Sequence, residues 1–232
     1  MAVSLILPCY NPPAGWARAV LSSYTRFCTG LSHKVELIIV MDGVSRSVTE
    51  EAIDFLKKSI PGLVLITYQE NRGKGYAIRK GVAQATGDIL IYTDIDFPYA
   101  PESLLAIYNA LNRNECDVAA GVKDETYYSH VPPLRRAISR NLQSLIKVFL
   151  SMPVTDTQCG LKGFRSNVKP LFLKTTIKRY LFDLEFIRNC FKSKQYRVKA
   201  VPVKLNDNVQ FRSMNYRILL PEMANFIKLL FK

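Results

Sequence analysis

Apolar and amphipathic segments alternate along the first half of the chain, and this alternation constrains the fold more than any other feature. Five short apolar runs suit buried strands, at residues 3–7, 35–41, 63–68, 89–93 and 118–122. Four longer stretches with helical spacing lie between them, at residues 15–29, 48–58, 75–85 and 101–114, with Ser47 or Thr49 as a cap and Pro101 in a first turn. This pattern predicts an α/β fold, with a mostly parallel sheet and helices on both faces.

Composition limits the compartment and the size of the protein. With 232 residues, 48% of them hydrophobic, the chain can bury one substantial core. Its 5 cysteines lack the paired spacing of a zinc site or a disulfide framework, which favours a reducing compartment. The first residues lack a basic region and reach Pro8 early, as in a first strand rather than a signal peptide. No apolar run is long enough to predict a spanning helix, so we expect a cytoplasmic protein.

Polar residues follow four successive strand candidates. Ligands of parallel sheets bind beyond the carboxyl ends of the strands, so these residues predict a single binding rim. The residues after any one of these strands are also compatible with an ordinary turn. The rim candidates are Pro8, Tyr10 and Asn11 after the first strand, Asp42 after the second, Arg72 and Lys74 after the third, and Asp94 and Asp96 after the fourth.

The pair Asp94 and Asp96 has the spacing of a metal site. Residues i and i+2 of an extended chain project to the same side, so both carboxylates can face one ligand. Mg²⁺ is usually held by one or two carboxylates together with substrate phosphates. The spacing alone is weak, because two acidic residues often occur this way by chance. Its place at the end of an apolar strand favours a site for Mg²⁺ or Mn²⁺.

The turn Gly73-Lys74-Gly75 invites comparison with phosphate-binding loops. It lacks the full P-loop spacing, and Ile78 stands where the dinucleotide fingerprint requires its last glycine. Both motifs are therefore excluded. What remains is a pair of cations, Arg72 and Lys74, beside the free N–H groups of a helix start, which suits contact with a nucleotide phosphate.

A net charge of +13 predicts a polyanionic partner: a nucleic acid, an anionic lipid surface or a phosphorylated substrate. The sequence shows no zinc-finger spacing, no RNP-like aromatic motif and no evident helix-turn-helix. We therefore expect no nucleic-acid partner.

The motifs occur in a recognisable order. They are Pro8-x-Tyr10-Asn11, Asp42-Gly43, Asn71-x-Gly73-Lys74-Gly75, Asp94-x-Asp96, Asp156-Thr-Gln158-Cys159-Gly160 and Phe182-Asp183-Leu-Glu185. This order resembles the GT-A glycosyltransferases of family 2, and within them the dolichyl- and polyprenyl-phosphate mannosyl- and glucosyltransferases. The resemblance implies the Rossmann-like GT-A fold of nucleotide-diphospho-sugar transferases over residues 1–210, followed by a basic amphipathic segment over 211–232.

The resemblance also implies roles for individual residues. Nucleotide-sugar binding falls to Pro8, Tyr10, Asn11, Asp42, Arg72, Lys74 and Asp94, with Asp42 beside the base. Metal binding falls to Asp94 and Asp96, and the catalytic acceptor-side block to Asp156 and Gln158. A bound divalent cation would stabilise the charge that develops on the departing diphosphate.

The acceptor decides whether a base is needed. A sugar hydroxyl must lose its proton, and a positioned carboxylate would contribute about 10²- to 10⁴-fold. A lipid phosphate is already ionised near neutral pH and needs cations instead. The candidate cations are Arg135, Arg136, Arg140, Arg165 and Arg212.

These observations predict an inverting, metal-dependent glycosyltransferase of cell-envelope glycan biosynthesis. It would move a hexose from a nucleotide sugar, with a UDP-sugar favoured over GDP-mannose, to a polyprenyl phosphate. Transfer to a glycan hydroxyl is the close alternative, and a basic membrane- or nucleic-acid-binding module without catalysis is the more distant one. The segment 211–232 suits either a helix in the membrane interface or a terminal helix packed on the domain. We expect a peripheral protein on the inner face of the cytoplasmic membrane.

Overall fold

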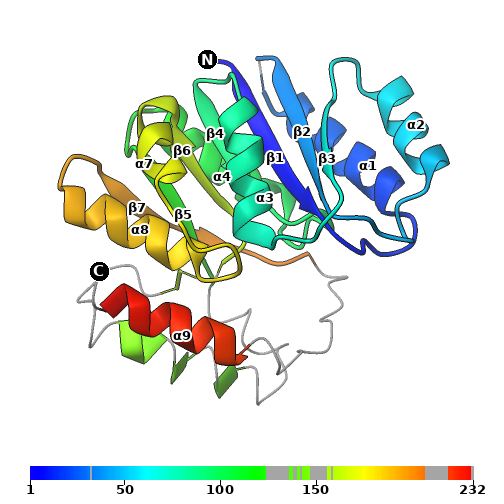
Figure 1. Ribbon diagram of the computed structural model, residues 1–232. Helices are drawn as coiled ribbons and strands as arrows, with labels where there is room; N and C mark the ends of the chain where they lie inside the picture. The colour runs from blue at the N-terminus through cyan, green and yellow to red at the C-terminus, as the bar shows by residue number, and fades with distance from the viewer. Residues whose placement is uncertain are drawn as a thin grey trace.

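A mixed sheet forms the centre of the molecule (Figure 1). The computed structural model describes residues 1–31, 33–123, 136–137, 140–141, 143–146, 156–157, 159–206 and 219–230. Within these residues the sheet has 7 strands in the order β3-β2-β1-β4-β6-β5-β7. The strands are β1 Val3–Cys9, β2 Val35–Asp42, β3 Val64–Tyr68, β4 Ile89–Tyr92, β5 Val118–Lys123, β6 Lys162–Arg165 and β7 Val198–Val203.

Most neighbouring strands are parallel, as the sequence predicts. The exception is β6, which lies antiparallel between β4 and β5 and pairs Lys162 with Tyr92 and Arg165 with Ile89. The first five strands agree with the predicted apolar runs. The sequence did not predict β6 and β7, because β6 is short and carries two charged residues, and β7 is a partly exposed edge strand that contains Lys199 and Pro202.

Helices cover both faces of the sheet (Figure 1). One face packs against α1 Trp16–Thr29, α2 Glu50–Ser59 and α4 Pro101–Asn112, and the other against α3 Lys74–Gln84, α7 Lys169–Leu173 and α8 Phe182–Ser193. A short 3₁₀ turn, η1 Ser166–Val168, precedes α7. Alternate residues of a strand point to opposite faces, so Leu5 and Leu7 enter the first core and Ile6 the second.

Local chemistry sets the helix starts. The Thr49 hydroxyl accepts a hydrogen bond from the Ala52 N–H at 3.3 Å and caps α2, and Pro101 occupies the first turn of α4. Gly73 precedes α3 with φ of 99°, a left-handed value that favours glycine. A Cβ on Gly73 would also lie 2.6 Å from the Lys178 carbonyl oxygen, so only glycine fits there.

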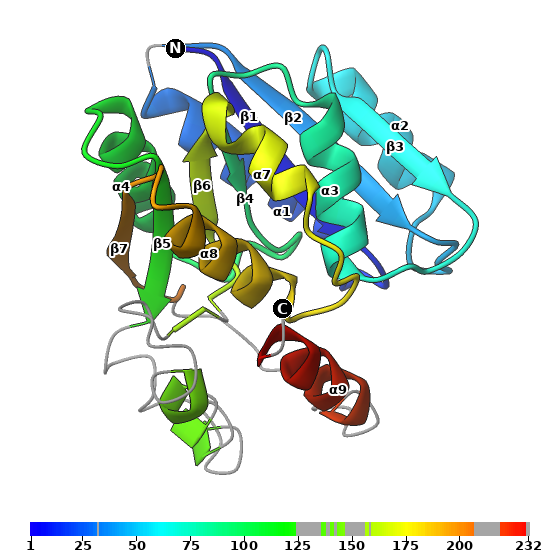
Figure 2. The ribbon, with the colours of Figure 1, turned by 60° about the vertical axis from the view of Figure 1, so that its left-hand side comes forward.

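The C-terminal helix α9, Leu219–Leu230, packs on the domain beyond the carboxyl ends of the strands (Figure 2). Phe226 and Leu229 enter the second core, and the Glu222 carboxylate accepts a hydrogen bond from the Leu181 N–H at 2.8 Å. Residues 219–230 of the predicted segment 211–232 therefore form a helix that packs on the domain, and its contact with a membrane interface stays a prediction.

Two large apolar side chains of α9 remain outside that contact. Met223 is 60% exposed and Ile227 is 49% exposed, one helical turn apart. No helix in the described part of the chain is long and apolar enough to cross a membrane. The predicted boundary at residue 210 lies outside the described residues.

Candidate functional site

The carboxyl ends of β1, β2, β3 and β4 bring their polar residues to one rim, as expected for neighbouring parallel strands. Contacts between the loops join these residues. The Asn11 side-chain oxygen accepts a hydrogen bond from the Ser45 hydroxyl at 2.7 Å, Asp42 holds the loop that follows β3, and Lys74 pairs with Asp94.

Asp42 is only 3% exposed, and its carboxylate is fully engaged. Its Oδ1 accepts from the Tyr68 hydroxyl at 2.8 Å and the Arg72 N–H at 2.7 Å, and its Oδ2 from the Gly73 N–H at 2.9 Å and Asn71 Nδ2 at 3.1 Å. A carboxylate offers about four acceptor positions, so these donors fill it. Asp42 therefore fixes the loop that leads to Lys74. A contact with the nucleotide base would require one of these donors to move.

Lys74 and Asp94 form an ion pair at the rim. The Lys74 Nζ lies 2.6 Å from the Asp94 Oδ1, with the two side chains 17% and 37% exposed. Burial by itself would lower the pKa of Lys74, but the charges of Asp94 and Asp183 raise it to about 12. Lys74 therefore stays protonated at neutral pH.

Gly160 covers this ion pair. A Cβ on Gly160 would collide with the Asp94 Oδ2 and would lie 3.3 Å from the Lys74 Nζ. The Gly160 N–H donates to the Tyr99 hydroxyl at 2.8 Å. The structure thus brings the acceptor-side motif directly onto the predicted donor and metal residues, although about 65 residues separate Asp94 from Gly160.

The residues present fit a divalent cation that is shared with a substrate. Asp96 is exposed, and the Phe97 N–H bonds to the Asp94 carbonyl at 3.0 Å in a turn where Phe97 has φ of 44°. Within the described residues, no group of three or more His, Cys, Asp or Glu side chains could hold a metal by itself. Two carboxylates with diphosphate oxygens and water would complete the shell that Mg²⁺ prefers, so Asp94 and Asp96 suit a shared site rather than a closed cage.

Asp156 lies in a buried ion pair. Its carboxylate accepts hydrogen bonds from the Lys123 backbone N–H at 2.7 Å and from the Lys123 Nζ at 3.3 Å, and both side chains are less than 10% exposed. This pairing fixes the Asp156 side chain at the end of β5. Gln158, the other predicted catalytic residue, lies outside the described residues.

The remaining nucleotide candidates differ in position. Pro8 is buried at the end of β1, while Tyr10 is 46% exposed and can meet a planar base. The Arg72 guanidinium lies 3.6 Å from the Glu70 carboxylate and 5.2 Å above the Tyr76 ring. Their nucleotide contacts stay predictions.

One predicted acceptor residue is corrected. Arg165 pairs with Ile89 at the opposite end of β4 from Asp94, and its guanidinium donates to the Leu111 carbonyl at 3.1 Å and the Asn114 side-chain oxygen at 3.0 Å. Since the strand separates it from the rim, Arg165 cannot meet a substrate bound there. Of the other acceptor candidates, Arg136 is partly buried and Arg140 exposed, and both stay predictions; Arg135 and Arg212 lie outside the described residues.

Sequence reasoning missed the group beneath the rim. Lys162 on β6 is completely buried, and its Nζ lies 3.1 Å from the Asp183 Oδ1, which also accepts the Tyr92 hydroxyl at 2.6 Å. The sequence motifs contained Asp183 but assigned it no role, and Lys162 follows the Asp156–Gly160 motif without a predicted partner. A lone charge in a sequence does not show whether it is buried.

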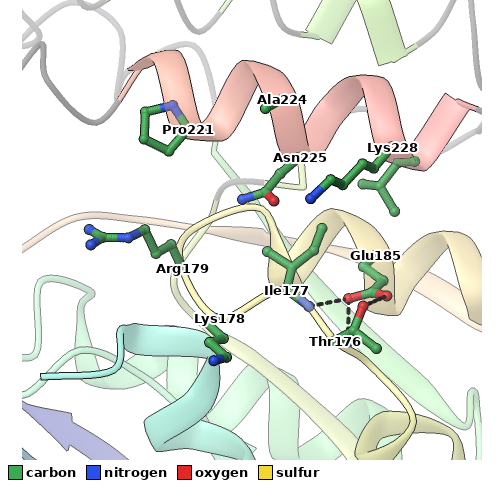
Figure 3. Close-up of a pocket in the computed structure, with 10 residues that line it drawn as sticks. Thr176, Ile177, Lys178, Arg179, Glu185, Pro221, Ala224, Asn225 and Lys228 are labelled. Atoms are coloured by element: carbon green, nitrogen blue, oxygen red, sulfur yellow. Dashed lines mark hydrogen bonds between the residues drawn. The ribbon is translucent and has the colours of Figure 1, made fainter. Parts of the chain in front are cut away.

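A pocket of about 530 Å³ separates α9 from the loop before α8 (Figure 3). Its lining combines cations with apolar side chains, namely Lys178, Arg179 and Lys228 with Ile177, Pro221 and Leu229. These residues were also not predicted.

The loop that lines this pocket is tied to the rim. Figure 3 shows the hydrogen bonds between the Glu185 carboxylate and the residues Thr176 and Ile177. The carboxylate accepts a hydrogen bond from the backbone N–H of each at 2.8 Å. The Lys178 carbonyl accepts the Tyr76 N–H of α3 at 3.1 Å. The loop that lines the pocket therefore also contacts the start of α3, where Lys74 lies.

The fold and the rim together define a GT-A type α/β protein, and comparison with known proteins gives the family. Residues 4–169 match the family model "Glycosyl transferase family 2". The chain therefore belongs to glycosyltransferase family 2, and the predicted resemblance is confirmed.

Similar curated proteins act on polyprenyl phosphates, according to their names. The chain is 24% identical to the dolichyl-phosphate beta-glucosyltransferase ALG5A of Trichomonas vaginalis over 88% of its own length and 66% of that protein. It is 26% identical to the dolichyl-phosphate beta-glucosyltransferase of Drosophila melanogaster (81% and 62%) and 27% identical to the undecaprenyl-phosphate 4-deoxy-4-formamido-L-arabinose transferase of Aeromonas hydrophila (72% and 49%). The chain thus spans 49% to 66% of the length of these relatives.

Solved structures support the fold. The glucosyl-3-phosphoglycerate synthase of Mycobacterium tuberculosis, in complex with Mn²⁺, UDP and phosphoglyceric acid, aligns with a TM-score of 0.68 and 15% identity over 94% of this chain and 73% of that one. The mannosyl-3-phosphoglycerate synthase of Rubrobacter xylanophilus aligns with a TM-score of 0.70 and 15% identity over 98% and 72%.

Proposed function

We propose that this protein is an inverting, metal-dependent glycosyltransferase that moves a hexose from a UDP-sugar to a polyprenyl phosphate. The observation that carries the proposal is the meeting of Lys74, Asp94 and Gly160 at the carboxyl ends of the strands. That rim combines a cation, two carboxylates and a helix N-terminus, which are the groups that a sugar nucleotide requires. The names of the polyprenyl-phosphate relatives and the bound UDP and Mn²⁺ of a structural neighbour support the same reading.

On the donor side, breaking the sugar–phosphate bond leaves negative charge on the diphosphate. The Lys74 ammonium, protonated at neutral pH, and the positive N-terminal end of the α3 dipole can stabilise that charge. Asp94 and Asp96 would hold Mg²⁺ or Mn²⁺, which supplies Lewis-acid stabilisation of the same leaving group when bound. An acceptor oxygen that attacks the anomeric carbon opposite the diphosphate inverts its configuration.

On the acceptor side, the environment of Asp156 favours a phosphate over a hydroxyl. A hydroxyl needs a base, and the Asp156 carboxylate is buried and engaged by both Lys123 donors. A phosphate monoester is already ionised near neutral pH. Asp156 would then position the 156–160 segment rather than accept a proton.

The pocket behind the Lys74 loop suits an amphiphilic anion. Lys178, Arg179 and Lys228 can attract a phosphate, while the apolar lining can contact isoprene units. The exposed Met223 and Ile227 of α9 would meet the membrane interface in a peripheral enzyme on the inner face of the cytoplasmic membrane.

Thermal unfolding with UDP, GDP and their sugar conjugates, each with and without Mn²⁺, tests the proposal. A ligand at about 100 times its Kd adds about 2.7 kcal/mol, which corresponds to roughly 5–10 °C for a domain of this size. We expect UDP with Mn²⁺ to give this shift in the wild-type protein and not in Asp96→Ala. The matched control Asp88→Ala removes an exposed carboxylate at the other end of β4 and should respond like wild type. Stabilisation by no nucleotide sugar would refute the transferase function, and stabilisation by GDP alone would refute the donor.

A further inference from the structure

The buried lysine beneath the rim has more partners than an ion pair needs. Lys162 is 0% exposed on β6, and its Nζ lies 3.1 Å from the Asp183 Oδ1. It also donates to the Thr157 carbonyl at 3.0 Å and to the Cys159 carbonyl. An ammonium has three donors, so all three are used.

Stability alone does not account for this arrangement. A buried ion pair can often be replaced by apolar side chains at no cost, because desolvation offsets the attraction between the charges. What an apolar residue at position 162 could not do is hold two carbonyl oxygens of one turn. The specific contribution of the Lys162 ammonium is therefore the placement of the Thr157 and Cys159 carbonyls.

That turn leads directly into the rim. Gly160 follows it, lies against Asp94 and Lys74, and donates its N–H to the Tyr99 hydroxyl at 2.8 Å. Asp156 precedes it. A shift of the turn would change the clearance above the Lys74–Asp94 pair, where the donor and the acceptor must meet. Misplacement by about 1 Å can cost about 100-fold in rate.

We infer that Lys162 is a positioning residue, whose ammonium fixes the Thr157 and Cys159 carbonyls, and with them Gly160, above the Lys74–Asp94 pair so that acceptor and donor are held in reacting geometry. This inference rests on the proposed function. The Asp183 carboxylate lies 3.1 Å from the ammonium, and the Tyr92 hydroxyl orients Asp183 through its 2.6 Å hydrogen bond. The three residues come from β4, β6 and α8, and they link the sheet to the acceptor-side segment.

The test compares Lys162→Met, Asp183→Asn and the double variant. Each single change leaves one buried partner without its counter-charge and should lower Tm by roughly 10 °C. The double variant removes both charges and should regain most of that loss. Its kcat should nevertheless stay about 100-fold below wild type, with KM for the donor within about three-fold, because the carbonyls still lack their donor. Asp183→Asn, which keeps Lys162, should retain turnover better than Lys162→Met.

Lys169→Met is the matched control. Lys169 also donates to two carbonyls, those of Ala83 at 3.1 Å and Ala85 at 2.8 Å, but at the far end of α3. It should lose stability without losing kcat. Turnover of the double variant within about three-fold of wild type would refute a positioning role and leave Lys162 a structural residue.

Hydrogen exchange of the 156–160 amides provides a readout that needs no substrate. In the double variant these amides should exchange at least ten-fold faster than in wild type, while those of β1 are unchanged. Unchanged exchange would overturn the inference even if the wild-type protein transferred no sugar. Absent transfer with faster exchange would instead refute only the proposed function.

Discussion

Replacing Asp42 with asparagine tests how the loop after β3 is built. Each carboxylate oxygen of Asp42 accepts two hydrogen bonds, so an amide NH₂ at either position must face two donors. If it replaces Oδ1, the Tyr68 hydroxyl can turn to accept, but the Arg72 N–H cannot. If it replaces Oδ2, the Gly73 N–H loses its acceptor. Either orientation leaves one backbone donor without a partner.

The cost follows from those bonds. An unsatisfied buried donor costs about 1–3 kcal/mol, and losing the charge from the remaining bonds costs about 1–2 kcal/mol more. We expect Asp42→Asn to lower the free energy of unfolding by about 3 kcal/mol, or Tm by roughly 6–12 °C. Because the loosened loop carries Lys74, the affinity for the donor nucleotide should also fall.

Urea unfolding followed by circular dichroism measures the first effect, and titration with UDP and Mn²⁺ the second. Asp88→Asn is the control, since Asp88 is exposed and its carboxylate accepts a hydrogen bond from the Ala2 N–H at 2.9 Å near the start of β4. It should cost less than about 0.5 kcal/mol. An Asp42→Asn variant as stable as Asp88→Asn would show that the four hydrogen bonds do not fix this loop.

Two further predictions concern the rim and α9. Gly160→Ala would place a methyl group against the Asp94 carboxylate. We expect the thermal shift produced by UDP with Mn²⁺ to fall by at least half, while Tm without ligand changes by less than about 3 °C. An undiminished thermal shift would contradict the close approach of Gly160 to Asp94. Burial raises the pKa of Glu222, although the hydrogen bond from the Leu181 N–H opposes this. The folded protein therefore holds the Glu222 proton to higher pH than the unfolded chain does. The stability that Glu222 contributes is present below the pKa of the unfolded chain and is lost as the pH rises through the pKa of the folded protein. Glu222→Gln does not titrate and should therefore gain stability relative to wild type between about pH 4 and pH 7 in urea unfolding; a difference that does not change with pH would count against the buried carboxylate.

Much of the fold was predictable, because apolar runs specify buried strands directly. The runs at 3–7 and 35–41 became β1 and β2, and the polar residues that follow them reached one rim because parallel strands end at the same edge. By contrast, β6 was not predictable: its four residues form a strand only because β4 and β5 flank it.

Part of the candidate site was likewise predictable from the sequence, and part was not. The sequence by itself determined where the predicted donor residues lie, since each candidate from Tyr10 to Asp94 follows a predicted strand. Only the tertiary structure placed Gly160 on Asp94, moved Arg165 to the far end of the sheet and buried Lys162 beside Asp183. The reason is physical: the period of side chains along a strand or helix is a local property, whereas whether a charge is buried depends on partners far along the chain, as Tyr92 and Asp183 are, 91 residues apart.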